Sequence, residues 1–156
     1  MPDIFVVDSN KLFRNLTVQY LNAADYNEVL TFSSADECLK FIDLHPDIVI
    51  TELHYGENKI NGIELLARIK TLSPKTKVIF LSSSGDIENA IKSVRMGAVD
   101  FIIKSKLALD KLVQRIKQLT VYNSEIKRAN SVNVTLAASL IILILLFISL
   151  IYLYTH

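Results

Sequence analysis

The sequence predicts an α/β fold, with a five-stranded parallel sheet covered by helices on both faces, followed by one C-terminal transmembrane helix. Short apolar runs alternate with amphipathic segments through residues 1–119, which is the pattern of repeated strand–helix units. Residues 132–154 contain no charged side chain. Apolar residues make up 51% of the 156 positions and charged residues 21%, so an intrinsically disordered chain is excluded.

Five short apolar runs are the expected strands. In chain order they cover residues 4–7, 27–31, 48–50, 78–81 and 99–103. The segments between and after them carry apolar residues at helical spacing, which predicts helices that connect parallel strands. The later helices are expected at residues 62–71, 86–96 and 106–119. Their expected inward positions include Ile63, Leu66, Ile69, Leu109, Leu112, Val113, Ile116 and Leu119.

The two earlier helices carry local signals of their own. The first has apolar positions Leu12, Leu16 and Tyr20. The second opens at Ser34-Ala-Asp-Glu37, which has the Ser-x-x-Glu form of a capping box. Cys38 is the one cysteine of the chain, which excludes an intrachain disulfide and a cysteine-based metal cage. Its apolar neighbours at helical spacing predict a small core residue.

The uncharged segment 132–154 is the expected transmembrane helix. Its 23 residues would span about 34 Å, slightly more than the roughly 30 Å hydrocarbon core of a bilayer. Thirteen Leu, Ile or Phe residues lie between Leu136 and Leu153, and they favour insertion by about 4 to 8 kcal/mol. The alternative is a buried core helix, but such helices are seldom apolar on all sides for this length. The expected organisation is a domain at 1–119, a linker at 120–131 and the span at 132–154.

The charges around this segment predict its orientation. Residues 104–128 hold seven Lys or Arg and two acidic residues, so the positive-inside rule places the folded domain in the cytoplasm and the C-terminus outside. The N-terminus lacks the basic and apolar regions of a signal peptide. We therefore expect a single-pass, tail-anchored membrane protein, as in a bacterial inner membrane. Residues 1–119 carry 15 basic and 15 acidic residues, so they have no electrostatic footprint for nucleic acid.

Polar side chains follow four of the expected strands. In parallel sheets, the carboxyl ends of the strands meet at one edge, where functional residues collect. The sequence contains no Walker loop, glycine-rich dinucleotide turn or nucleophile elbow. The residues expected at this edge are Asp8, Ser9, Thr51, Glu52, Ser82, Ser83 and Lys104.

Five phrases carry a family resemblance through their order and spacing. They are Ile-Phe-Val-Val-Asp8, His45-Pro-Asp-Ile-Val-Ile-Thr-Glu52, Asn61-Gly-Ile-Glu-Leu-Leu66, Val-Ile-Phe-Leu-Ser82-Ser83 and Met96-Gly-Ala-Val-Asp-Phe-Ile-Ile-Lys104. Over about residues 3–118 the chain resembles the receiver domain of two-component response regulators. The resemblance implies a flavodoxin-like, doubly wound sheet with strand order 2-1-3-4-5.

The resemblance also implies roles at the phosphoacceptor and the metal site. In this family an aspartate that ends strand three accepts phosphate from a histidine kinase, and an acidic pair that ends strand one helps to hold Mg²⁺. Glu52 stands at the position of the acceptor in this chain. Asp8 matches the first acid of the pair, whereas Ser9 stands at the position of the second. Asp8 and Glu52 are therefore the expected ligands of a weakened Mg²⁺ site.

Three further positions match the family's switch residues. Ser82 matches the hydroxyl that ends strand four, Phe101 matches the strand-five aromatic that reports the switch, and Lys104 matches the lysine that contacts the phosphoryl group. Ser105 replaces the proline that usually follows this lysine, and the loop 53–61 is about two residues longer than the family's.

These departures predict a receiver that does not cycle through phosphoaspartate. Glutamate is one methylene longer than aspartate, and such a misplacement costs about 10²-fold in rate. Mg²⁺ demands near-ideal geometry, so the loss of a carboxylate at Ser9 weakens its site, and no resident cofactor is expected. The preferred function is a non-enzymatic, membrane-anchored pseudo-receiver that binds signalling proteins, such as a histidine kinase or another membrane or cytoplasmic partner. A homodimer is compatible with the pattern.

Two other functions stay open at this point. The chain could still be a phosphorylatable receiver that uses Glu52 and weakly bound Mg²⁺, or a scaffold that oligomerises through its span. Only residues 120–131 separate the last helix from the span, so we expect no DNA-binding output domain in this chain.

The individual residues have simpler interpretations too. Ser9 would suit the N-cap of the first helix, and Glu52 could be a solvated carboxylate. Ser82 could merely satisfy a strand end, Lys104 could form a structural ion pair, and Phe101 could be plain core packing.

The apolar segment generates the first testable prediction. Full-length protein should sediment with membranes and resist carbonate extraction, because the span inserts favourably into hydrocarbon. Truncation after residue 119 should release the remaining protein to the soluble fraction. Immunoblots of fractionated cells measure both, and full-length protein found mainly in the soluble fraction would contradict the anchor.

Overall fold

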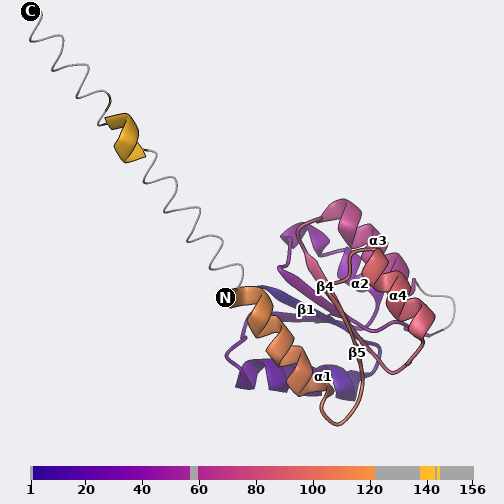
Figure 1. The fold of residues 1–156 in the computed structure, drawn as a ribbon. Coiled ribbons are helices and arrows are strands. Elements are labelled where there is room, and N and C mark those ends of the chain that lie inside the picture. Colours follow the sequence, from indigo (N-terminus) through magenta and orange to yellow (C-terminus); the bar gives the residue numbers. More distant parts are fainter. Residues whose placement is uncertain (1, 57–59, 122–137, 143, 145–156) are drawn as a thin grey trace, which may run out of the picture. The chain divides into compact units, whose positions relative to one another are not determined.

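The computed structural model describes residues 2–56, 60–121, 138–142 and 144 of the chain. The chain divides into two compact units, Met1–Ile116 and Lys117–His156. In the first unit, five parallel strands form one sheet in the order β2-β1-β3-β4-β5 (Figure 1), which confirms the predicted α/β fold and strand order. The strands are β1 (Ile4–Val7), β2 (Val29–Phe32), β3 (Ile48–Thr51), β4 (Lys77–Ser82) and β5 (Asp100–Ile103).

Helices lie on both faces of this sheet. Figure 1 shows α2, α3 and α4 along one face and α1 on the other, and α3 packs against both α2 and α4. A last helix covers residues 108–121, close to the expected 106–119. The other helices are α1 (Lys11–Ala23), α2 (Ala35–Leu39), the 3₁₀ helix η1 (Ile42–Leu44), α3 (Gly62–Leu72) and α4 (Ile87–Arg95).

The three central strands are the least exposed part of the sheet. β1 and β3 are buried along their whole length, and β4 is buried from its second residue onward. Helices on both faces require such strands to be apolar on both sides, which explains why they are continuous Val, Ile and Phe runs rather than alternating ones. β2 and β5 lie at the edges and are partly exposed.

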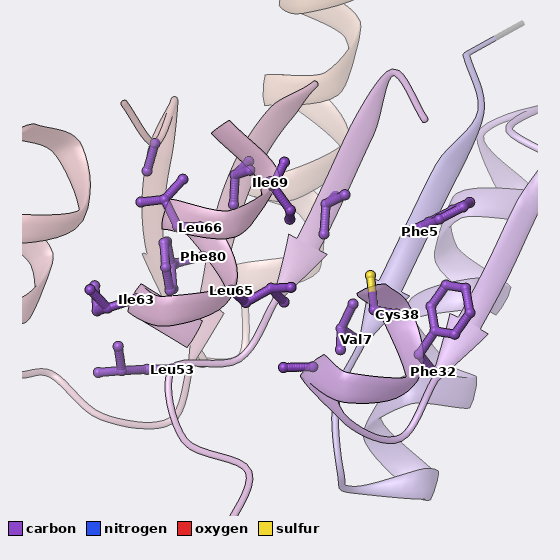
Figure 2. Close-up of a cluster of buried hydrophobic side chains, with 14 of the residues drawn as sticks. Phe5, Val7, Phe32, Cys38, Leu53, Ile63, Leu65, Leu66, Ile69 and Phe80 are labelled. Carbon is purple, nitrogen blue, oxygen red and sulfur yellow. The ribbon is translucent and has the colours of Figure 1, made fainter. Parts of the chain in front are cut away.

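The main core cluster fills the space between the sheet and the helices α2 and α3. Figure 2 shows Leu66 of α3 beside Phe80 of β4, with Leu65 and Ile69 on the same helix, while Cys38 of α2 lies near Phe32. Cys38 is completely buried, which confirms its prediction as a core residue. Full burial of each large apolar side chain contributes about 1.5–3 kcal/mol, so this cluster is a main source of the fold's stability.

Helix α1 differs from the expectation in its rotational phase. Leu12 is 82% exposed, and Leu16 and Tyr20 are also exposed, whereas Thr17 and Leu21 are buried. The helix is capped by Asn10, whose side chain accepts a hydrogen bond from the backbone N–H of Phe13. The N-cap interpretation of Ser9 is therefore wrong.

Thr17 explains why a polar residue can lie on the inner face of α1. Its hydroxyl donates to the carbonyl of Phe13 at 2.9 Å, so burial leaves no unsatisfied polar atom there. Because the apolar and the buried positions differ, hydrophobic spacing alone mispredicts this face.

The capping signal of α2 is confirmed with a small shift. Ser34 accepts a hydrogen bond from the backbone N–H of Glu37 at 3.2 Å. The carboxylate of Glu37 reaches back to the backbone N–H of Ser33, at 2.7 Å, rather than to that of Ser34. The reciprocal bonds of a capping box therefore close one residue earlier than in its standard form.

The expected transmembrane segment lies largely outside the described residues. Residues 138–142 and 144 of it are helical. Among the residues that the structure describes, no helix combines the length and the hydropathy needed to cross a membrane.

One glycine sets how closely α3 approaches the end of β3. A Cβ atom added to Gly62 would lie 2.3 Å from the backbone oxygen of Glu52 and 2.8 Å from a ring carbon of Phe80. The backbone N–H of Gly62 donates to the carbonyl of Leu53 at 2.8 Å, so this contact is also hydrogen-bonded. The start of α3 and the residue that follows β3 therefore hold each other in place.

This contact predicts that Gly62→Ala destabilises the protein by about 1–3 kcal/mol, because the backbone of Glu52 or the ring of Phe80 must move. Gly85→Ala is the matched control, since its added Cβ would meet only Ile103, at 3.6 Å. Denaturant unfolding measures the difference. Equal stability of the two variants would show that the chain relaxes around Gly62 without cost.

Candidate functional site

The register of the sheet brings the ends of its central strands together. Val7 pairs with Thr51 between β1 and β3, and Ser82 pairs with Ile103 between β4 and β5. The next residues, Asp8 and Glu52, therefore leave the sheet side by side, and the backbone N–H of Glu52 donates to the carbonyl of Val7 at 3.0 Å. This is the edge at which the sequence predicts a site.

Three charged side chains meet at this edge as a buried ion triad. The Nζ atom of Lys104 lies 2.6 Å from Oδ2 of Asp8 and 2.6 Å from Oε2 of Glu52. The side chain of Lys104 is 14% exposed, that of Asp8 7% and that of Glu52 4%. Hydrogen-bonded pairing offsets the cost of removing these charges from water, which for an unpaired charge is several kcal/mol.

The carboxylate of Glu52 also accepts hydrogen bonds from uncharged donors. The hydroxyl of Ser83 donates to Oε2 at 2.9 Å, and the backbone N–H of Ser83 donates to the same oxygen at 3.1 Å. The backbone N–H of Leu53 donates to Oε1 at 2.7 Å. The interpretation of Glu52 as a solvated carboxylate is therefore wrong.

These donors decide the ionisation of Glu52. Burial by itself raises the pKa of this carboxyl group, because it disfavours the charged form. Hydrogen bonds from Lys104, Ser82 and the backbone of Leu53, together with the positive charge of Lys104, outweigh burial, so the pKa is lowered from its usual value. Glu52 therefore carries a negative charge at neutral pH.

Asp8 and Lys104 are held by α1 as well as by each other. The backbone N–H of Asn10 donates to Oδ1 of Asp8 at 2.8 Å, and the guanidinium of Arg14 donates to the carbonyl of Asp8. The ring of Phe13 lies under the ammonium of Lys104, with 4.3 Å from Nζ to the ring centroid. The N-terminal part of α1 therefore forms one wall of the site.

Two other predicted positions lie beside the triad. Ser82 is fully buried and accepts a hydrogen bond from the backbone N–H of Ser84 at 3.1 Å. Phe101 is half-buried and stacks on Phe80, with ring centroids 5.6 Å apart and planes 21° apart. Phe101 therefore packs against the core, as its simpler interpretation expects.

Sequence reasoning identified the triad but not its full set of hydrogen-bond partners. It named Ser83 as a residue of this edge without giving it a role, yet Ser83 supplies two of the donors to Glu52. It did not include Leu53 or Phe13. Ser83 was detectable as a hydroxyl directly after a strand, whereas the contact of Phe13 depends on the phase of α1.

Comparison with known proteins agrees with this arrangement. The model of the response regulator receiver domain family matches residues 4–117, and the chain belongs to this family. An NtrX-like response regulator of Rickettsia felis is 32% identical over 129 residues, which cover 82% of this chain and 26% of that protein. The chain thus spans about a quarter of the length of this curated relative.

Solved structures show the same fold. The receiver domain of NtrX from Brucella abortus is 32% identical, with a TM-score of 0.67, and the match covers 74% of this chain and 96% of that one. A CheY-like receiver domain protein from Methanospirillum hungatei is 25% identical, with a TM-score of 0.70, over 78% and 95% of the two chains. The family is that of two-component signalling, in which receiver domains interact with histidine kinases and can dimerise.

The residues of this edge differ from the family's Mg²⁺ site in their set of possible ligands. Within the part of the chain that the structure describes, no three His, Cys, Asp or Glu side chains converge as metal ligands. Asp8 and Glu52 face each other, but one oxygen of each is bonded to Lys104. Ser9 is exposed and brings no carboxylate. Oxygen ligands are what Mg²⁺ requires, and the two carboxylates present are already engaged.

The lowered pKa of Glu52 predicts a pH-dependent contribution to stability. A carboxyl group whose pKa is lower in the folded state stabilises the fold above its unfolded pKa, near 4.5, and that stabilisation is lost as the pH falls through the folded pKa. Glu52→Gln should therefore lower the free energy of unfolding by about 1.5–3 kcal/mol at pH 7, the contribution of a charged hydrogen bond. The difference from wild type should shrink below about pH 4.

Denaturant unfolding at several pH values tests this, with the exposed Glu64→Gln as the matched control. A difference that stays constant from pH 7 to pH 3 would mean that the charge of Glu52 is not what stabilises the site.

Proposed function

We propose that this chain is a pseudo-receiver, a non-enzymatic signalling module in which Glu52 supplies a permanent negative charge at the position where the family carries a transient phosphoryl group. The observation that carries the proposal is the 4% exposed carboxylate of Glu52, engaged by Lys104, Ser83 and Leu53. A phosphoacceptor must present a free oxygen lone pair in line with the donor. Here the donors of the protein occupy both oxygens.

The lowered pKa of Glu52 supports the same function. A carboxylate stabilised by a cation and several donors is a weak nucleophile, because its lone pairs are already used. The family's strand-five lysine contacts a phosphoryl group, and in this chain Lys104 contacts Glu52 itself at 2.6 Å. The longer side chain of glutamate thus brings a negative charge to the lysine without a chemical step.

A signalling role requires a surface for partners, and α4 is the best candidate. Ser93 is the one buried residue of this helix. Ile87 is 74% exposed, and Ile91 and Val94 are about half exposed, although all three are apolar. Exposed apolar side chains that gather on one element are typical of protein–protein contacts. Binding of a signalling protein at α4, next to the end of β4, is therefore part of the proposal.

The proposal includes attachment to a membrane through residues 132–154. Its support is the uncharged composition of this segment and the basic residues that precede it. Attachment would confine the receiver-like domain to the membrane surface, where sensor kinases and membrane complexes are concentrated.

The proposed function predicts that the protein resists phosphorylation. Full-length protein incubated with acetyl phosphate and Mg²⁺ should show no added phosphoryl group in its intact mass, because no acceptor oxygen is free. The double variant Ser9→Asp, Glu52→Asp is the matched control, since it restores the family's acidic pair and the shorter acceptor. It should gain a phosphoryl group that base removes.

A phosphoryl group on the wild type that disappears in Glu52→Gln would refute the pseudo-receiver. It would establish the alternative, a receiver phosphorylated on glutamate.

A further inference from the structure

The ammonium group of Lys104 is enclosed by groups from three different elements. Oδ2 of Asp8, after β1, and Oε2 of Glu52, after β3, each lie 2.6 Å from Nζ. The ring of Phe13, in the first turn of α1, lies 4.3 Å from Nζ on another side. Two anions and an aromatic face are the partners that an organic cation prefers.

We propose that Lys104 is the resident cation of this site and closes it to divalent metal ions. The inference rests on the proposed function in one respect, because it concerns the same ion triad. It does not depend on which partner binds or on whether Glu52 mimics a phosphorylated state.

The charges at the site explain the exclusion. Asp8 and Glu52 together carry two negative charges, and Lys104 neutralises one of them. A divalent ion would have to displace an ammonium group that is 14% exposed or bind within a few ångström of it. Repulsion between these cations is strong at low effective dielectric constant, so the ammonium and the metal compete for the same two carboxylates.

The remaining carboxylate oxygens offer little to a metal. Oδ1 of Asp8 accepts from the backbone N–H of Asn10, and Oε1 of Glu52 accepts from the backbone N–H of Leu53. Oε2 of Glu52 accepts from Ser83 in addition to Lys104. A metal ion would therefore compete with at least one hydrogen bond at each oxygen that it gained.

Phe13 makes the enclosure selective for an ammonium group. Its ring attracts a cation through its face but supplies no oxygen ligand, and Mg²⁺ keeps most of its water when bound to proteins. A hydrated metal ion would lie against the apolar ring of Phe13, whereas the ammonium group of Lys104 is attracted to the face of that ring. Phe13 is thus a positioning residue for Lys104.

Removal of the lysine charge tests the proposal. Metal-free full-length protein in detergent micelles is titrated with Mn²⁺, and free Mn²⁺ is measured by electron paramagnetic resonance. Wild type should bind Mn²⁺ no better than the double variant Lys104→Gln, Glu52→Gln. Lys104→Gln alone should bind about tenfold more tightly or better, because two buried carboxylates then lack a cation. Phe13→Leu, which keeps the apolar volume but removes the π face, should bind more tightly than wild type and less tightly than Lys104→Gln.

Two results would overturn the proposal. One is wild type that binds Mn²⁺ as tightly as Lys104→Gln, and the other is Lys104→Gln with no gain over the double variant. If Lys104→Gln does not fold, ¹⁵N spectra of the lysine ammonium groups of the wild type decide the question. The Lys104 signal should be unchanged by millimolar Mg²⁺, and a shift to that of a solvent-exposed lysine would show displacement.

These results are separable from the proposed function. Wild type that bound Mn²⁺ yet gained no phosphoryl group would end the resident-cation inference and leave the pseudo-receiver intact. Wild type that excluded Mn²⁺ yet became phosphorylated on Glu52 would end the pseudo-receiver proposal and leave the resident-cation inference intact.

Discussion

The bridge from Lys104 to Asp8 and Glu52 is the interaction on which the rest of the site depends. Lys104 is 96 positions from Asp8 and 52 positions from Glu52 in the sequence. The bridge therefore exists only when β1, β3 and β5 are in register. A buried charge without its partner costs several kcal/mol. The triad therefore stabilises the native packing of these strands as well as forming the site. The backbone contact of Gly62 with Glu52 adds a second condition, because it fixes where the chain leaves β3.

The chain has the fold of the receiver family, but two residues of its site differ from those that the family's chemistry uses. The sheet order, the buried central strands and the lysine after β5 belong to a fold that serves phosphoryl transfer in two-component signalling. Glu52 and Ser9 stand where that chemistry needs a shorter acid and a second acid. In their place the structure has a closed set of hydrogen bonds, in which the longer carboxylate reaches Lys104 and Ser83 directly. Under the proposed function, this hydrogen-bonded site holds one state rather than switching between two.

The contacts of α1 connect this site to the surface. Phe13 and Asn10 face the triad, while Leu12 and Leu16 of the same helix are exposed. A change at Lys104 would therefore alter its contact with Phe13, on a helix whose other face is exposed. α4 presents a second set of exposed apolar side chains close to the end of β4. The two helices lie on opposite faces of the sheet (Figure 1).

The sequence by itself determined the fold and the members of the ion triad. Buried parallel strands must be continuous apolar runs, and the polar residues after them must meet at one edge, so Asp8, Glu52 and Lys104 were predictable from spacing together with the family resemblance. Tertiary structure alone decided what depends on helix phase and on burial. Hydrophobic spacing favoured Leu12, Leu16 and Tyr20 in α1, but Thr17 and Leu21 are the buried residues, and the hydroxyl of Thr17 is satisfied there by the carbonyl of Phe13. The donors from Ser83 and Leu53, and the ring of Phe13, likewise follow from three-dimensional proximity, because nothing in a linear pattern says which hydroxyl or ring closes around a charge once water is excluded.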